Sequence, residues 1–441
     1  MNSAVATVNA QTLIPHARWI RIIPPAIIVY IIAFMDRMNI GFAMAGGMNE
    51  ALGISMASSG LAAGMFFIGY LLLQAPAGHI AEHRSAKNYI ACTIVAWGGI
   101  SVLTGFVHNF WQLIVLRLLL GVAEGGIYPA IFVIVGNWFP QKELGRANGL
   151  FLCSLPLSAV LTNPVSGWII THYGWRWLFF AEGAVSLGLI FIWWPLISDR
   201  PTEAKWLSEE EKAYLLAALA ADRVAKAAAI KTSEQVNCSY KQLCADKYLW
   251  LMTAIFFCFC TASLGYAIWL PTLLKQLMKL NLTYVGWLTS LPFLMSLTGL
   301  YLMGALSDRK GNRRFYIALS MIGFCVCLWF ATLFPSHIWL TYGLLVFAGL
   351  TQKSMQSPFW AVPSLLFPPG VAGAARGLIN GVGNLGSFCG SVLVGWIMTK
   401  TGNMTHAMYA LAAVSMLGGV ITILLPKITT GYKQTMEVKA R

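Results

Sequence analysis

Long apolar runs separated by short polar stretches dominate the sequence. Each run is about 20 residues or longer, which is enough for a helix to cross the hydrocarbon core of a bilayer. Twelve such runs are recognisable, and the longest polar gap divides them into two groups of six. They cover approximately residues 22–45, 57–78, 88–107, 112–136, 147–170 and 177–197, and then 249–271, 283–306, 315–334, 339–366, 374–398 and 406–426. The pattern predicts an all-α membrane protein with twelve transmembrane helices in two six-helix bundles.

Composition supports lipid as the solvent for most of the surface. Charged residues make up 10% of the chain and hydrophobic residues 58%, with a mean hydropathy of +0.68. Soluble domains carry about 25% charged residues, so this chain has too little polar surface for a set of soluble domains. The nine cysteines form no CxxC pair or Cys/His cluster. We therefore expect no metal, no cofactor and no disulfide framework.

The lysines and arginines predict the orientation. Three of the 30 lie well inside apolar runs and four in odd-numbered loops; the others lie in the N-terminus, the even-numbered loops and the C-terminus, with Arg376 at the boundary of its run. Because cytoplasmic loops carry the excess of basic residues, both termini are expected in the cytoplasm. The net charge of +14 is explained by this orientation. No concentrated basic face indicates a nucleic-acid partner.

The polar gap predicts three regions. They are an N-terminal six-helix bundle over residues 1–198, a cytoplasmic linker over 199–247 and a C-terminal six-helix bundle over 248–441. Within the linker, residues 206–223 are expected to form a surface helix. Ser208 is its candidate N-cap, with Glu211 at the third helical position of a capping box.

The two bundles are similar in sequence. FPQKELGRANGL, residues 139–150, aligns with FPPGVAGAARGL, residues 367–378, at an offset of 228. GHIAEHRSAKN, residues 78–88, aligns with GALSDRKGNRR, residues 304–314, at 226. Six runs separate the copies, so the duplication is parallel. Transporters built from such repeats bind their substrate near the midplane between the halves.

Ionisable residues inside the apolar runs are the candidates for function, because a charge at mid-bilayer is costly. Away from the boundaries of the runs there are six, Asp36, Arg37, Arg117, Glu124, Glu182 and Lys353. Glu182 lies near the outer end of its run, where a structural role is expected. Arg117, Gly121, Glu124 and Tyr128 share one helical face, and Tyr30, Phe34, Arg37 and Gly41 share another. The two faces are expected to oppose one another, either as interhelical salt bridges or as a transport site.

The C-terminal half offers polar and aromatic groups with few charges. Asn380, Asn384, Ser387 and Ser391 follow one helical face. Lys353, Gln356 and Trp360 lie in a run with expected breaks near Pro358 and Pro363, and Tyr266 and Trp269 lie together in GYAIWLP. For the asparagines and aromatic residues, helix packing and substrate contact remain equal alternatives.

Several segments resemble a known family. RLLLGVAEGGIYPA (117–130), FMDRMNIGFA (34–43) and SPFWAVP (357–363) resemble motifs of the anion:cation symporters of the major facilitator superfamily. The loop after the eighth run resembles the cytoplasmic signature of that superfamily, with Asp308, Arg309 and Arg313. Its first copy is degraded, with Glu82 in place of the aspartate. The resemblance covers nearly the whole chain and is closest to bacterial permeases for phthalate, hydroxyphenylacetate, tartrate and sugar acids.

The resemblance implies roles for individual residues. Arg37 would bind the substrate carboxylate, Asp36 and Glu124 would carry protons, and Arg117 would be the partner of Glu124. The resemblance also places Tyr70 and Asn384 at the site, and Lys353 is a departure from the family pattern. The helix faces add Arg117, Lys353, Asn380, Trp360, Tyr266 and Trp269 as candidate substrate contacts. The loop residues Glu82, Asp308, Arg309 and Arg313 would form a conformational gate.

We therefore expect a proton-coupled symporter, monomeric and surrounded by lipid in a bacterial inner membrane. It would import a small organic anion, either an aromatic carboxylate or a sugar acid, with protons as the coupling ion. Alternatives are an anion exchanger or uniporter without proton coupling and, less favoured, a drug exporter. An enzyme is not expected, because all seven histidines fall in loops or at the ends of the runs.

Overall fold

The structure is a computed structural model that describes residues 17–233, 240–334 and 336–426. Within these ranges the chain forms helices and no strand, as the apolar runs predicted. The N-terminal bundle consists of α1 (Ala17–Ala45), α3 (Met56–His83), α4 (Ala86–Thr104), α5 (Phe110–Glu124) with α6 (Ile127–Trp138), α7 (Gln141–Leu152) with α8 (Ser154–Tyr173), and α9 (Trp175–Gly188) with α10 (Ile190–Leu196). The short α2 (Met48–Leu52) lies between α1 and α3.

The second bundle repeats this arrangement. It consists of α13 (Lys247–Met278), α14 (Leu282–Lys310), α15 (Arg313–Leu333), α16 (Ile338–Gln352) with α17 (Gln356–Ala361) and α18 (Pro363–Leu366), α19 (Pro369–Thr401) and α20 (Met404–Ile423). Eleven helices in the described part of the chain are long and apolar enough to span a membrane. The remaining predicted run, 339–366, is divided into α16, α17 and α18. The prediction of two bundles of membrane-spanning helices is confirmed.

Proline interrupts the corresponding helix in each bundle. Pro129 follows the break between α5 and α6, and Pro358 follows the break between α16 and α17. Proline has no N–H for the carbonyl four residues earlier and its ring crowds that carbonyl. The helix therefore unwinds just before each proline. As a result, Glu124 ends α5 and Lys353 caps the end of α16, at related positions of the two repeats.

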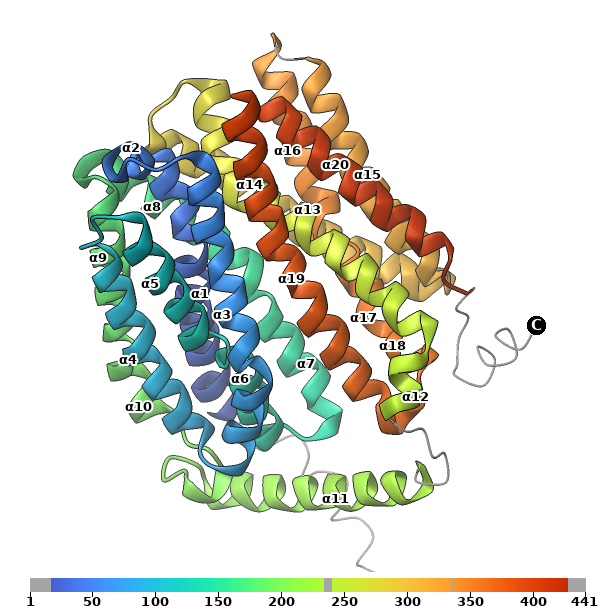
Figure 1. Cartoon of the computed structure of the whole chain (residues 1–441). Coiled ribbons are helices and arrows are strands. Elements are labelled where there is room, and N and C mark those ends of the chain that lie inside the picture. Colours follow the sequence, from blue (N-terminus) through green and yellow to red (C-terminus); the bar gives the residue numbers. More distant parts are fainter. Residues whose placement is uncertain (1–16, 234–239, 335, 427–441) are drawn as a thin grey trace, which may run out of the picture.

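The linker helix α11 (Glu209–Ser233) lies across one end of the molecule, and α2 lies at the opposite end (Figure 1). Ser208 accepts a hydrogen bond from the Glu211 backbone N–H at 3.2 Å, which confirms the predicted N-cap. The Glu211 side chain does not turn back to complete a capping box. It accepts from the buried Arg18 of α1 at 2.6 Å, and Arg18 also pairs with Glu143 of α7 at 2.9 Å. These ion pairs fix α11 to the N-terminal bundle.

The two bundles touch through α3 against α19, α8 against α14, and α1 against α13. Glycines permit the closest approaches. A Cβ on Gly60 of α3 would lie 2.5 Å from the Ser391 carbonyl oxygen of α19, and one on Gly167 of α8 would lie 2.1 Å from the Leu282 carbonyl oxygen of α14. Both contacts belong to the halves of these helices that face α2. The bundles are therefore closed at the end opposite α11.

A group of charged residues between the bundles

Arg37 and Glu124 form an ion pair inside the N-terminal bundle. Nη2 of Arg37 on α1 lies 3.4 Å from Oε2 of Glu124 at the end of α5. The guanidinium is also 4.7 Å from the ring centre of Tyr70 and 5.0 Å from that of Phe66, both on α3. Among the described residues, Nε of Arg37 and Oε1 of Glu124 have no hydrogen-bond partner. The pair is therefore only partly satisfied, and 11% of the Arg37 side chain remains exposed.

Gly121 of α5 and Gly125, which caps the end of that helix, bring Tyr70 to this pair. A Cβ on Gly121 would lie 2.0 Å from the Phe66 carbonyl oxygen, and one on Gly125 would lie 2.5 Å from the Tyr70 carbonyl oxygen. Only glycine permits backbones to approach this closely. Gly121, on the predicted face, and the adjacent Gly125 thus allow α3 to lie against α5, and this places Tyr70 over the Arg37 guanidinium.

Asp36 points away from its neighbour Arg37. Its carboxylate is fully buried and accepts hydrogen bonds from Ser101 Oγ of α4 at 2.7 Å and from Ser186 Oγ of α9 at 2.9 Å. Asn39 Nδ2, one turn along α1, lies 3.4 Å away. Neighbouring side chains diverge by about 100° on a helix, so the adjacent acid and base serve different surroundings.

Arg117 does not form the expected ion pair with Glu124. Its Nη2 donates to Asn39 Oδ1 at 2.9 Å, and its Nη1 donates to the Asp36 backbone carbonyl at 3.3 Å. Seven residues separate Arg117 from Glu124, which places their Cα atoms about 10 Å apart along the helix. The Arg117 side chain instead donates hydrogen bonds to residues of α1, and the ion-pair partner of Glu124 is Arg37.

Glu182 belongs to the same buried group, although the sequence favoured a structural role at a helix end. It is 2% exposed. Oε2 accepts from Asn39 Nδ2 at 2.8 Å, and Oε1 accepts from Ser166 Oγ of α8 at 2.9 Å. Asn39 therefore lies between two carboxylates, those of Asp36 and Glu182. The sequence showed Glu182 as an acid within an apolar run, which marked it as a candidate. It did not show that Asn39 and Ser166 are its hydrogen-bond partners.

Lys353 is the charged residue that the second bundle contributes. It caps the end of α16, its ammonium lies 5.9 Å from the ring centre of Phe259, and it is within electrostatic range of Arg37 in the other bundle. Nearby on α19, Asn384 Nδ2 donates to Asn380 Oδ1 at 3.0 Å. These asparagines thus face one another along one side of the helix, as their spacing predicted.

The aromatic residues of the second bundle are less closely associated with the charges. The Tyr266 hydroxyl donates to the Leu345 carbonyl at 3.0 Å, and Trp269 Nε1 donates to the Ser391 carbonyl at 3.2 Å. Both rings are almost fully buried. Trp360 packs on Phe256, with ring centres 5.0 Å apart. Helix packing accounts for Tyr266 and Trp269, and a substrate contact by any of the three stays a prediction.

The predicted gate residues lie on the surface. Asp308 near the end of α14 and Arg313 at the start of α15 form an ion pair at 3.1 Å. Arg309 and Glu82 are exposed, and among the described residues neither forms an ion pair. The observed pair therefore joins two neighbouring helices of one bundle. Control of the opening by these residues stays a prediction.

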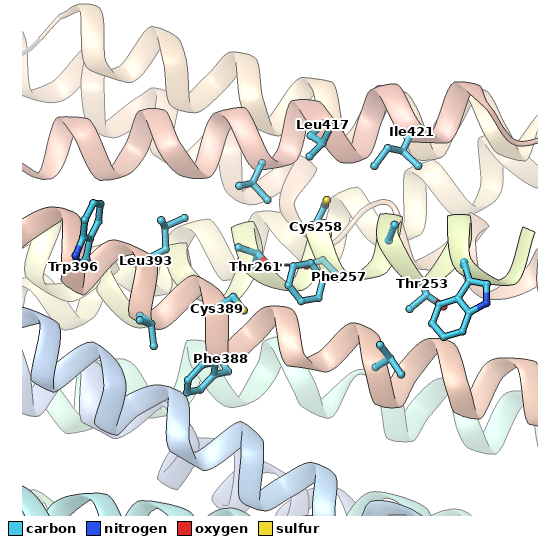
Figure 2. A pocket seen from close by; sticks show the side chains of 15 residues that line it. Thr253, Phe257, Cys258, Thr261, Phe388, Cys389, Leu393, Trp396, Leu417 and Ile421 are labelled. Carbon is cyan, nitrogen blue, oxygen red and sulfur yellow. Dashed lines mark hydrogen bonds between the residues drawn. The ribbon is translucent and has the colours of Figure 1, made fainter. Parts of the chain in front are cut away.

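A cleft of about 800 Å³ lies elsewhere, between α13, α19 and α20 (Figure 2). Apolar side chains such as Phe257, Leu393 and Leu417 form most of its wall, and none of the described residues that line it is charged. Trp250 and Trp396, which also line it, are about half exposed. The cleft therefore belongs to the outer apolar surface of the bundle and offers no charged group to an anion.

Comparisons with known proteins agree with this architecture. The profile of the Major Facilitator Superfamily matches residues 26–284 and 274–437. A protein of Agrobacterium vitis named "Putative tartrate transporter" is 33% identical over 427 residues, which are 95% of this chain and 96% of that protein. The "Quinolone resistance transporter" of Acinetobacter baumannii is 30% identical over 436 residues, with 95% and 96% covered. The solved structure of a bacterial homolog of the human lysosomal transporter Spinster superposes with a TM-score of 0.73 at 15% identity, covering 91% of this chain and 95% of that one, and shows the fold alone.

Proposed function

The chain belongs to the major facilitator superfamily, and we propose that it is a symporter that moves a small organic anion together with protons. The substrate class we favour is an aromatic carboxylate or a sugar acid. Membership in the superfamily makes the chain a multi-pass membrane transporter and not an enzyme. The predicted resemblance to the sugar-acid and related permeases and the predicted location in the inner membrane are confirmed.

The ion pair between Arg37 and Glu124 carries the proposal. A planar guanidinium is the group that best binds a carboxylate through two parallel hydrogen bonds. In this protein an internal carboxylate already occupies part of that guanidinium, at 3.4 Å. A substrate anion and Glu124 therefore compete for Arg37. A proton on Glu124 neutralises the internal competitor and leaves the arginine to the substrate.

The same competition explains release. When Glu124 loses its proton, its carboxylate returns to Arg37 and displaces the substrate anion. Asp36 would hold a second proton, because its carboxylate is buried among serine hydroxyls and has no ion-pair partner among the described residues. Together with Glu182, the N-terminal bundle buries three acids against Arg37 and Arg117. This excess of one acid lets the group bind one proton with every cation still balanced, and a second proton leaves one cation for the substrate anion.

The predicted orientation in the membrane allows the described conformation to be assigned to one state of the transport cycle. If both termini are cytoplasmic, as the basic residues predict, α11 lies on the cytoplasmic side. The glycine contacts of Gly60 and Gly167 then close the outer side. We assign this conformation to the inward-facing state, in which the substrate leaves and Glu124 regains Arg37.

Proton movement in proteoliposomes tests the function. A pH-sensitive dye is enclosed in the vesicles, and an aromatic or sugar acid from a panel is added outside. Symport carries protons inward with the anion, so the lumen becomes acidic. Glu124→Gln and Asp36→Asn should lose this acidification while anion exchange persists, because the arginine is retained. Glu203→Gln, at an exposed surface acid, is the matched control and should behave as wild type.

The sign of the signal separates the alternatives. The relative named for quinolone resistance favours export as a second candidate. A proton-driven exporter moves its substrate and the proton in opposite directions, so an added anion would make the lumen alkaline. An exchanger or uniporter without proton coupling would leave the lumen pH unchanged. Acidification that persists unchanged in both Glu124→Gln and Asp36→Asn would contradict the competition mechanism.

A further inference from the structure

Lys353 carries a positive charge that no acid of its own bundle balances. Residues 248–441 contain two acids, Asp308 and Glu437. Asp308 pairs with Arg313 in a surface connection, and Glu437 lies outside the described residues. No ion pair within the part of the chain that the structure describes includes Lys353. This lysine differs in that respect from Arg37, which has Glu124.

The surroundings of Lys353 make an isolated charge costly. The ammonium is near the Phe259 ring and within electrostatic range of the Cys260 thiol, and the residue is only partly exposed. Neither neighbour supplies a full negative charge. An ammonium removed from water is stable when an anion accompanies it. The position is therefore suited to a negative group that comes from outside the protein.

Arg37 provides a second cation across the interface between the bundles. It is within electrostatic range of Lys353. The distance of 3.4 Å to Glu124 exceeds the 2.7–2.9 Å that is usual for a charge-assisted hydrogen bond. Once Glu124 is protonated, neither Arg37 nor Lys353 has an ionised acid as ion-pair partner among the described residues, and the two cations belong to different bundles.

We propose that the substrate is a dianion whose two carboxylates bind Arg37 and Lys353, one in each bundle. This inference rests on the proposed transport of an organic anion and narrows its class. A monoanion on Arg37 would leave Lys353 unbalanced, whereas a dianion balances both cations. Because the two cations belong to different bundles, a bound dianion also holds the bundles together around itself.

Matched pairs of acids test the charge requirement. Binding to the purified full-length protein is measured by calorimetry at pH 7 for succinate against butyrate, glucarate against gluconate, and phthalate against benzoate. In at least one pair the dianion should bind about tenfold to a hundredfold more tightly, as expected for one additional charged contact. Lys353→Gln should abolish this preference by weakening the dianion and leaving the monoanion unchanged.

Two further variants separate charge from folding. Lys353→Arg keeps the positive charge and should retain part of the preference. Lys400→Gln removes an exposed charge at the far end of α19 and should change nothing. Equal binding within all three pairs, no binding by any dianion, or a preference that survives in Lys353→Gln overturns the proposal.

The proposed function is tested separately by the dye experiment with wild-type protein. Proton-coupled uptake of a monoanion that does not depend on Lys353 overturns the dianion inference and leaves symport standing. A dianion preference that depends on Lys353, combined with no proton movement, overturns symport and leaves the dianion inference standing.

Discussion

The contact between α8 and α14 yields a quantitative prediction for the closing of the bundles. Gly286 of α14 faces Asn163 and Pro164 of α8 near the end that carries α2. A Cβ on Gly286 would lie 2.5 Å from the Asn163 carbonyl oxygen and 3.0 Å from Pro164 Cα. Both neighbours are backbone atoms, so no side chain can rotate away. Gly286→Ala must therefore push the two bundles apart in the closed state.

The size of the effect follows from the distance. Ordinary van der Waals contact begins at 3.4 Å, so the alanine must gain 3.4 minus 2.5, or about 0.9 Å, from the Asn163 oxygen. Overpacking of this kind costs about 1–3 kcal/mol. The bundles are separate bodies, and the strain vanishes when this end opens. The equilibrium between closed and open states should then shift toward opening by about 5- to 150-fold.

Hydrogen exchange at two amides measures this shift. The Thr283 N–H donates to Thr171 Oγ1 across the α8–α14 contact at 3.1 Å, and the Ala57 N–H donates to Thr399 Oγ1 across the α3–α19 contact at 2.8 Å. Both amides lie in first helical turns, where they have no intrahelical acceptor. Their protection therefore depends on the closed bundles. In Gly286→Ala both amides should exchange faster by the same factor.

The second amide makes the test discriminating. Local distortion of α14 would speed exchange at Thr283 and leave Ala57 unchanged, whereas opening of the bundles must affect both. Gly99→Ala is the matched control, because a Cβ on Gly99 of α4 would meet no atom of the described residues within 4 Å. Unchanged exchange at both amides, or a change at Thr283 alone, would refute the reasoning.

Two other predictions concern buried ion pairs and buried acids. Arg18→Met should reduce the free energy of unfolding by about 3–5 kcal/mol, because it leaves the buried Glu211 carboxylate without its cation. Thermal and denaturant unfolding of the purified protein measures this loss, and adding Glu211→Gln should recover part of it; an additive double variant would contradict the pairing. Glu182→Gln should slow pH-gradient-driven uptake about tenfold through its loss from the Asp36–Asn39 group. Uptake at the wild-type rate with unchanged pH dependence would assign Glu182 to a structural role.

The sequence predicted the features that depend on local chemistry. The length and hydropathy of the apolar runs determined the membrane-spanning helices. Proline indicated where the tenth run breaks, and Ser208 indicated where the linker helix begins. The duplication and the rarity of intramembrane charge identified Arg37, Glu124 and Lys353 as candidates. These inferences succeed because the cost of placing a polar group in lipid depends little on which helices surround it.

The tertiary structure decided which groups meet. Helical spacing placed Arg117 and Glu124 on one face of α5. The packing of α1 against that face decided that Glu124 pairs with Arg37 and that Arg117 donates to Asn39. Packing of α9 on α1 brought Glu182 into the acidic group. A buried side chain finds its partner across helices that are distant in sequence, so the choice depends on crossing angles and close glycine contacts. The apolar pattern of a single helix does not determine its crossing angles or its glycine contacts with other helices. These are set only when the helices pack together in the bundle.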